Sequence, residues 1–160
     1  MRVRRATEGQ RNRDGSTDPS ASEVDLLAVL LFLHLYVGLA FMFGMLGLSI
    51  WAYVLLRRKQ SLPERFYRAL RILAGLFAFQ VLSGLLFIAL GHLPSDLLHF
   101  LYAGLALLAV GASEMLRPTS SFGRILREEG HFKEAGVFAL VAVVAFLFAL
   151  RLWMTGVGLP

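Results

Sequence analysis

The 160-residue chain contains no cysteine, and only 17% of its residues are charged. The absence of cysteine excludes disulfides, iron–sulfur clusters and thiolate metal sites. A soluble domain usually carries about 25% charged and 45–50% apolar residues, whereas this chain is 57% hydrophobic. This composition argues against a soluble enzyme and favours a membrane protein.

Several short motifs that would indicate a particular chemistry are also missing. The chain has no HExxH, phosphate-loop or CxxCH motif and no spacing typical of a Ser-His-Asp triad. The net charge of +5 comes from basic residues placed between apolar runs, as membrane topology requires, so a nucleic-acid partner is not expected. The sequence indicates a membrane subunit rather than a stand-alone enzyme.

Four long uncharged runs account for the hydrophobic excess. Runs of about 18–20 residues match a hydrocarbon core of roughly 30 Å at 1.5 Å per residue. The predicted fold class is an all-α membrane protein with a four-transmembrane-helix bundle at residues 26–156. The predicted helices cover residues 26–56, 66–91, 95–116 and 134–153.

The segments outside these runs suggest where the domain begins and how one helix starts. Residues 1–25 are polar and contain Gly, Pro and Ser, so we predict a disordered tail that cannot bury enough apolar surface to fold. The 26–56 run is longer than a membrane requires, so this helix must tilt or protrude. Ser61-Leu-Pro-Glu64 fits a capping box at the start of the second helix.

The distribution of Lys and Arg predicts an orientation. The segments 57–71 and 117–133 together hold ten basic residues, whereas the segment 91–96 holds none. Because short cytoplasmic loops carry the excess of Lys and Arg, the two basic segments are predicted to be cytoplasmic. The N and C termini then lie outside, and we expect an integral protein of a bacterial inner membrane.

A faint internal repeat links the first and third predicted helices. Tyr36-Val-Gly-Leu-Ala40 matches Tyr102-Ala-Gly-Leu-Ala106 at four of five positions, and His34 and His99 precede the two segments. A parallel duplication of this kind would make the chain two tandem hairpins in the same orientation.

His34 and His99 are the main candidates for chemistry. Ionisable residues within transmembrane segments are rare and usually face the bundle interior. Measured from the midpoints of their apolar runs, His34 lies about 10 Å and His99 about 9 Å towards the predicted outer side, at 1.5 Å per residue. Two histidines at one depth on different helices suit bis-axial ligation of a haem iron.

Several neighbouring residues fit a haem site. Gly38 and Ala103 follow the two histidines by one helical turn and would leave room for the porphyrin. Arg151, at the outer end of the last helix, could pair with the haem propionates, and the hydroxyls of Tyr36 and Tyr102 could do similar work. A plainer interpretation is that small residues pack helices together, that Arg151 anchors its helix end, and that the histidines hydrogen-bond across helices or contact a quinone.

The helix count and the histidine pair resemble those of small four-helix transmembrane b-type cytochromes and haem-bearing anchor subunits of quinone-linked oxidoreductases. This resemblance implies one haem b and electron transfer between quinol and a partner. A second hypothesis is a non-catalytic structural or assembly subunit of a larger respiratory or photosynthetic membrane complex. A third is a small transporter component. Expected partners are the lipid bilayer and either other membrane subunits or further copies of the chain.

Overall fold

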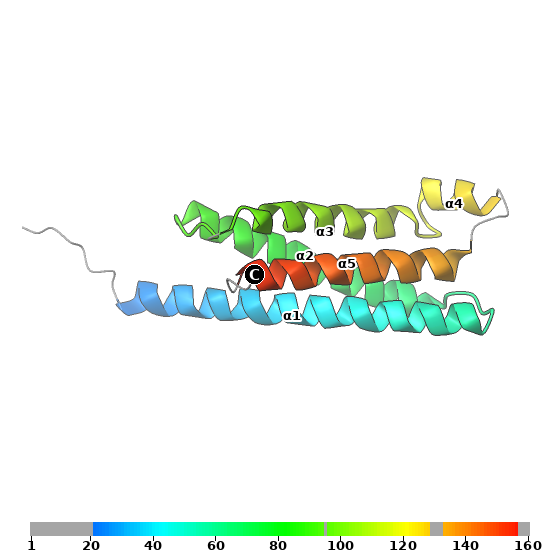
Figure 1. Ribbon diagram of the computed structural model, residues 1–160, viewed down its shortest axis with the longest axis horizontal. Helices are drawn as coiled ribbons and strands as arrows, with labels where there is room; N and C mark the ends of the chain where they lie inside the picture. The colour runs from blue at the N-terminus through cyan, green and yellow to red at the C-terminus, as the bar shows by residue number, and fades with distance from the viewer. Residues whose placement is uncertain (1–20, 95, 129–132, 157–160) are drawn as a thin grey trace, which may run out of the picture.

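The computed structural model describes residues 21–94, 96–128 and 133–156, and the described chain is helical. Four of its helices are long and apolar enough to cross a membrane, which confirms the predicted four-helix membrane bundle. α4 is a short additional helix between α3 and α5 (Figure 1). The helices are α1 (Ala21–Arg57), α2 (Glu64–Ala89), α3 (Leu98–Met115), α4 (Ser121–Glu128) and α5 (Glu134–Gly156).

The four long helices do not all pack against two neighbours as in a closed four-helix bundle. α1 and α3 run in one direction, and α2 and α5 run in the other (Figure 1). α5 packs along both α1 and α3, and α1 also packs against α2, whereas α2 and α3 have little contact with each other. The bundle is therefore held together by α1 and α5, and α2 and α3 are splayed apart.

Small side chains explain the central position of α5. Ala142, Ala145 and Ala149 are buried along one face of this helix, and such residues let helix backbones approach closely within a membrane. The buried Ser49 Oγ donates a 3.0 Å hydrogen bond to the backbone carbonyl of Ala139 and so links α1 to α5. Close packing of α5 against its neighbours follows from this alanine face.

The tightest packing lies at the end of the bundle that contains the α1–α2 turn. Phe66, Tyr67 and Phe138 form an edge-on aromatic cluster with ring centroids 5.7–5.8 Å apart. The Tyr67 hydroxyl donates to the Glu134 carboxylate, which also forms an ion pair with Arg127 of α4. This end of the bundle is thus locked by both aromatic and polar contacts.

Helix boundaries differ from the predictions in informative ways. α1 begins at Ala21, inside the segment predicted to be a tail, because helical structure continues beyond the uncharged run; residues 1–20 lie outside the described residues. The capping-box prediction is wrong: Pro63, in an extended conformation, is the N-cap of α2 and no side chain caps it. α1 extends past the other helices at its N-terminal end (Figure 1), in agreement with its excess length.

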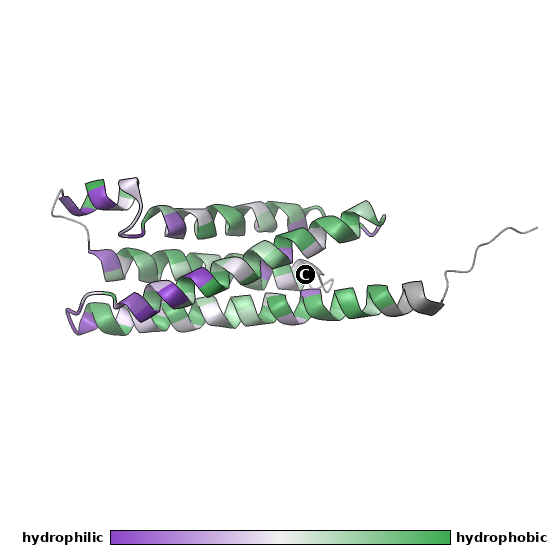
Figure 2. Ribbon diagram, turned by 180° about the vertical axis from the view of Figure 1, so that it is seen from behind, coloured by the Kyte–Doolittle hydropathy of each residue, from purple (hydrophilic) through white to green (hydrophobic). Residues whose placement is uncertain are grey.

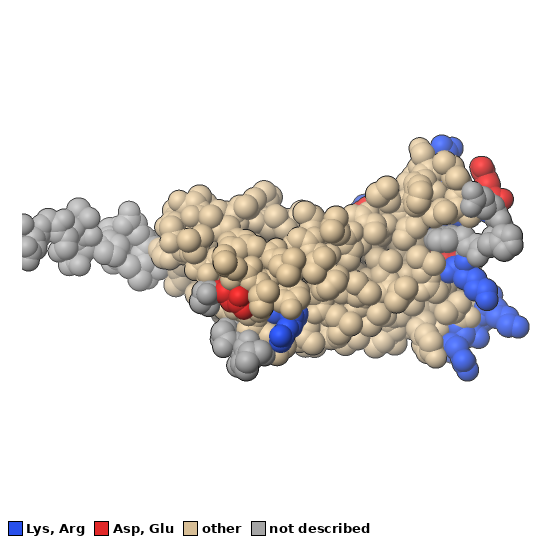
Figure 3. Space-filling view, turned by 45° about the horizontal axis from the view of Figure 1, so that its top comes forward, with Lys and Arg blue, Asp and Glu red and all other residues tan. Residues whose placement is uncertain are grey.

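The surface has the polarity expected for a membrane-spanning bundle. Apolar residues predominate along the long helices (Figure 2), and side chains such as Leu82 and Leu108 are 66% and 70% exposed. Lys and Arg side chains gather at the end of the bundle that contains the α1–α2 turn (Figure 3). The two ends of the molecule therefore differ strongly in charge.

Candidate functional site

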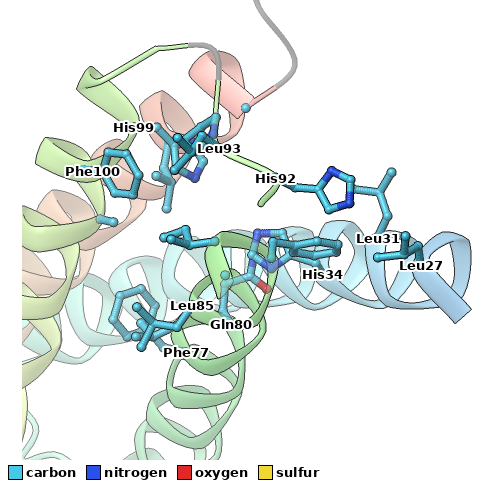
Figure 4. A pocket seen from close by; sticks show the side chains of 18 of the residues that line it. Leu27, Leu31, His34, Phe77, Gln80, Leu85, His92, Leu93, His99 and Phe100 are labelled. Carbon is cyan, nitrogen blue, oxygen red and sulfur yellow. The ribbon is translucent and has the colours of Figure 1, made fainter. Parts of the chain in front are cut away.

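A cavity of about 470 Å³ lies at the end of the bundle opposite the α1–α2 turn. This volume is within the range of about 300–1,000 Å³ that small-molecule and cofactor sites occupy. Its wall is built from α1, α2, α3, α5 and the α2–α3 connection, and it is mostly apolar (Figure 4). Among the described residues that line it, no side chain is acidic, Lys or Arg; the polar ones are His34, Gln80, His92 and His99.

The splaying of α2 away from α3 creates the cavity. The two helices are joined by the short segment Leu90–Leu97 but scarcely touch, so the space between them is not filled by core side chains. Leu85 on α2, Leu93 in the connection and Phe100 on α3 line the cavity and are 56%, 69% and 40% exposed. The cavity therefore has an apolar rim on the side that faces the membrane.

His34 enters the cavity from α1 and is held by α2. Its Nδ1 lies 2.7 Å from Ser83 Oγ, and the Ser83 hydroxyl is 3.0 Å from the carbonyl of Gln80 in its own helix. The imidazole contacts the Phe87 ring edge-on at 5.6 Å. Its Cε1 lies 3.5 Å from where a Cβ would stand on Gly84. The side chain is thus fixed by a hydrogen bond and by packing on one helix face.

His99 enters the cavity from α3 and is held in the same way by α5. Its Nδ1 lies 3.4 Å from Thr155 Oγ1. Thr155 Oγ1 is itself within 3.0–3.1 Å of the Leu152 and Arg151 carbonyls. The imidazole edge formed by Cε1 and Nδ1 packs against Gly156, 3.4 and 3.7 Å from an added Cβ.

The two histidines share one local arrangement. Each is on the first helix of a hairpin, and each contacts a hydroxyl residue followed by glycine on the second helix, Ser83-Gly84 or Thr155-Gly156. The hydroxyl oxygen contacts Nδ1 of the imidazole, and the glycine, which has no side chain, leaves room for Cε1. This correspondence extends the repeat seen in the sequence to α2 and α5.

The second ring nitrogen of each histidine is left available. Both imidazoles line the same cavity. Within the described part of the chain, neither His34 Nε2 nor His99 Nε2 has a hydrogen-bond partner. Neither atom is among the fully buried polar atoms that lack a partner, so both keep some accessible surface. One nitrogen of each ring is therefore tied to a neighbouring helix, and the other remains free to bind a ligand.

The other candidate residues divide between the cavity and the outside of the bundle. Ala103 lines the cavity beside His99. Gly38 faces α2 instead, where an added Cβ would stand 3.0 Å from Gln80 Nε2. Tyr36 is 53% exposed and stacks on Phe32 with ring centroids 4.2 Å apart. It does not line the cavity.

Arg151 and Tyr102 contact each other rather than the cavity. The Arg151 guanidinium carbon lies 6.0 Å from the centroid of the Tyr102 ring, within the range of a cation–π interaction. Neither residue lines the cavity. His92 does line it, near the α2–α3 connection, with its ring 6.5 Å from that of Phe87 (Figure 4).

Gln80 is the remaining polar side chain of the cavity wall. Its Oε1 is buried and has no hydrogen-bond partner within the described chain, which is an unfavourable state for an amide inside a membrane. The described residues contain no group of three or more His, Asp or Glu side chains suited to a bare metal ion. The cavity thus receives imidazoles from two separate helices, His34 from α1 and His99 from α3, and a third, His92, near the α2–α3 connection.

Comparison of the chain with known protein families, curated proteins and solved structures found no match. The fold and the cavity define a four-helix membrane-spanning bundle with a histidine pair at one end.

Proposed function

We propose that the protein binds one haem b between His34 and His99 and passes electrons between quinol and a partner. The observation that carries the proposal is the placement of both imidazoles at one cavity with Nε2 unpartnered. Haem iron takes imidazole nitrogens as axial ligands, and a ligating histidine usually hydrogen-bonds through its other ring nitrogen. His34 and His99 line the same cavity, and each contacts a hydroxyl through Nδ1, which supports the proposal.

The cavity wall suits a large, flat and mostly apolar cofactor. Its volume of about 470 Å³ and the absence of charged side chains among its described lining residues favour burial of an apolar ring system. Ala103 contributes a small side chain beside His99. When bound, a haem would supply one-electron redox chemistry, while the protein supplies the two ligands and an apolar surround.

The rim of the cavity supports a lipophilic electron partner. Leu85, Leu93 and Phe100 are exposed on the face where α2 and α3 separate, within the apolar part of the bundle. A soluble redox protein would need a polar or charged docking surface there. A quinol arrives through the lipid phase, and these three side chains present it with apolar surface.

The charge distribution supports an orientation for the site. Arg57, Arg58 and Lys59 lie at the α1–α2 turn, and further basic residues follow on α2 and α4. We place this end in the cytoplasm by the positive-inside rule, in the inner membrane of a bacterium. The cavity and both termini then belong to the outer side.

A structural or assembly subunit of a larger membrane complex is the second candidate. Gly104 and Gly111 on α3 and Gly75 on α2 are exposed, and a Cβ at any of them would meet nothing within 4 Å. Small exposed residues of this kind allow a helix of another subunit to pack closely.

A redox difference spectrum tests the proposal. Protein purified after expression with ample haem should show a Soret band and sharp reduced α and β bands, and His34→Ala or His99→Ala should each abolish them. No such bands in the wild-type protein would refute haem binding. Recovery of a stable larger complex by affinity purification, with the histidine substitutions harmless to it, would favour the structural subunit.

A further inference from the structure

The hydroxyl groups of Ser83 and Thr155 contact the two cavity histidines, and each has a hydrogen-bond acceptor in its own helix. A serine or threonine hydroxyl has one proton to donate and lone pairs with which to accept. Ser83 Oγ lies between the Gln80 carbonyl and His34 Nδ1, at 3.0 and 2.7 Å. A carbonyl can only accept, so both hydrogen bonds form together only when the Ser83 proton goes to Gln80 and His34 Nδ1 carries a proton.

The same argument applies to His99. Thr155 Oγ1 is close to the carbonyls of Arg151 and Leu152, at 3.1 and 3.0 Å. Its proton goes to one of them, so its lone pair faces His99 Nδ1. The ring edge that carries Nδ1 is the edge packed on α5, and Nδ1 lies 3.4 Å from Thr155 Oγ1. His99 therefore also donates from Nδ1.

We infer that Ser83 and Thr155 are matched positioning residues that hold His34 and His99 as Nδ1–H tautomers and leave both Nε2 lone pairs free in the cavity. The alternative tautomer would place an Nε2–H donor without a partner in a mostly apolar space, which is unfavourable. The use of these lone pairs for iron rests on the proposed function, whereas the tautomers themselves do not.

Glycine completes the arrangement at both positions. Gly84 follows Ser83 and Gly156 follows Thr155, and each lets the Cε1 edge of an imidazole reach the neighbouring helix. The hydroxyl thus determines which ring nitrogen of the histidine carries the proton. The glycine determines how closely the imidazole approaches the neighbouring helix. Neither residue touches the iron in this scheme, since both act through the histidines.

The tautomers can be measured without any cofactor. Long-range proton–nitrogen correlation spectra of the full chain labelled with ¹⁵N-histidine in detergent micelles distinguish Nδ1–H from Nε2–H. His34→Gln and His99→Gln variants assign the signals. We expect both rings to be Nδ1–H in the wild-type protein. An Nε2–H signal for either ring would overturn the inference for that residue, and this result needs no substituted hydroxyl.

Substitution of each hydroxyl should affect only its own histidine. Ser83→Ala should release His34 into the Nε2–H form or a mixture while His99 is unchanged, and Thr155→Val should do the reverse. Thr155→Ser keeps the hydroxyl and should keep the tautomer. Ser49→Ala is the matched control, because it removes a buried hydroxyl that bonds Ala139 instead. An unchanged His34 signal in folded Ser83→Ala protein would overturn the inference.

Haem titration separates the two proposals. Loss of such an outer hydrogen bond typically weakens metal binding by about 10–100-fold, so we expect Ser83→Ala to raise the haem dissociation constant by that factor and Ser49→Ala to leave it unchanged. Nδ1–H tautomers in a protein that binds no haem would refute the proposed function and leave the inference standing. Haem binding of equal strength in Ser83→Ala and wild-type protein would contradict the positioning role.

Discussion

His34 on α1 and Ser83 on α2 are 49 residues apart in the chain, and their side chains meet at 2.7 Å. His99 and Thr155 repeat the relationship between α3 and α5 at 3.4 Å. These two contacts tie each cavity imidazole to the second helix of its hairpin. The site therefore depends on the packing of each hairpin as much as on the histidines.

The size of residue 84 should control the site. A Cβ on Gly84 would be 3.5 Å from His34 Cε1, an ordinary contact, so Gly84→Ala should retain haem binding. Gly84→Leu should displace the imidazole and abolish the α and β bands while the helical circular dichroism is preserved. Gly75→Leu, at an exposed position of the same helix with open space around it, is the control. Intact α and β bands in Gly84→Leu would show that His34 does not depend on this packing.

Close approach of α1 and α2 should make Gly44 intolerant of substitution. An added Cβ would overlap the Leu73 side chain, which is buried. Overpacking of this kind costs about 1–3 kcal/mol, so Gly44→Ala should lower the thermal unfolding temperature in micelles. At Gly47 a Cβ meets nothing within 4 Å, so Gly47→Ala should leave it unchanged or raise it. Equal unfolding temperatures for the two variants would contradict the packing described here.

The polar contacts of Arg127 should stabilise the charged end. Arg127 donates to the carbonyls of Gly123 and Leu116, at 2.7 and 3.1 Å, and to the Glu134 carboxylate. Arg127→Met should expose α4 and its flanking residues to protease, because these acceptors lose their charged donor. Tyr67→Phe removes one hydrogen bond to Glu134 and should cost only about 1 kcal/mol. Protection of α4 in Arg127→Met equal to that of the wild type would refute this role.

Much of the fold could be predicted from the sequence, because the four apolar runs are long and separated by polar segments. The short helix α4 is different: it lies in a polar segment for which no helix was predicted. The start of α2 was mispredicted because Ser61 precedes the helix by more than a capping residue does, and Pro63 takes the N-cap position.

The site could be predicted only in part. The equal depth of His34 and His99 indicated that they could meet, and the structure places both at one cavity. The one-turn spacing to Gly38 suggested open space, but that face of α1 packs on Gln80, because sequence spacing does not fix the rotation of a helix against its neighbour. Ser83 and Thr155 gave no signal without knowledge of which helices touch.

The proposed orientation can be tested with single cysteines, since the chain has none of its own. Lys59→Cys at the charged end should be protected from a membrane-impermeant maleimide in intact cells and react only after permeabilisation. His92→Cys, at the opposite end, should react directly. The reverse labelling pattern would place the cavity on the cytoplasmic side and contradict the positive-inside assignment.

The central claim is that His34 and His99 ligate one iron together, and haem titration of the purified apoprotein tests it most directly. We predict that the spectrum of a low-spin, six-coordinate haem saturates at one haem per chain in the wild-type protein and does not form in His34→Ala or His99→Ala, whereas His92→Ala retains it. Failure of the wild-type protein to bind haem, or an unchanged six-coordinate spectrum in either single variant, would contradict the claim.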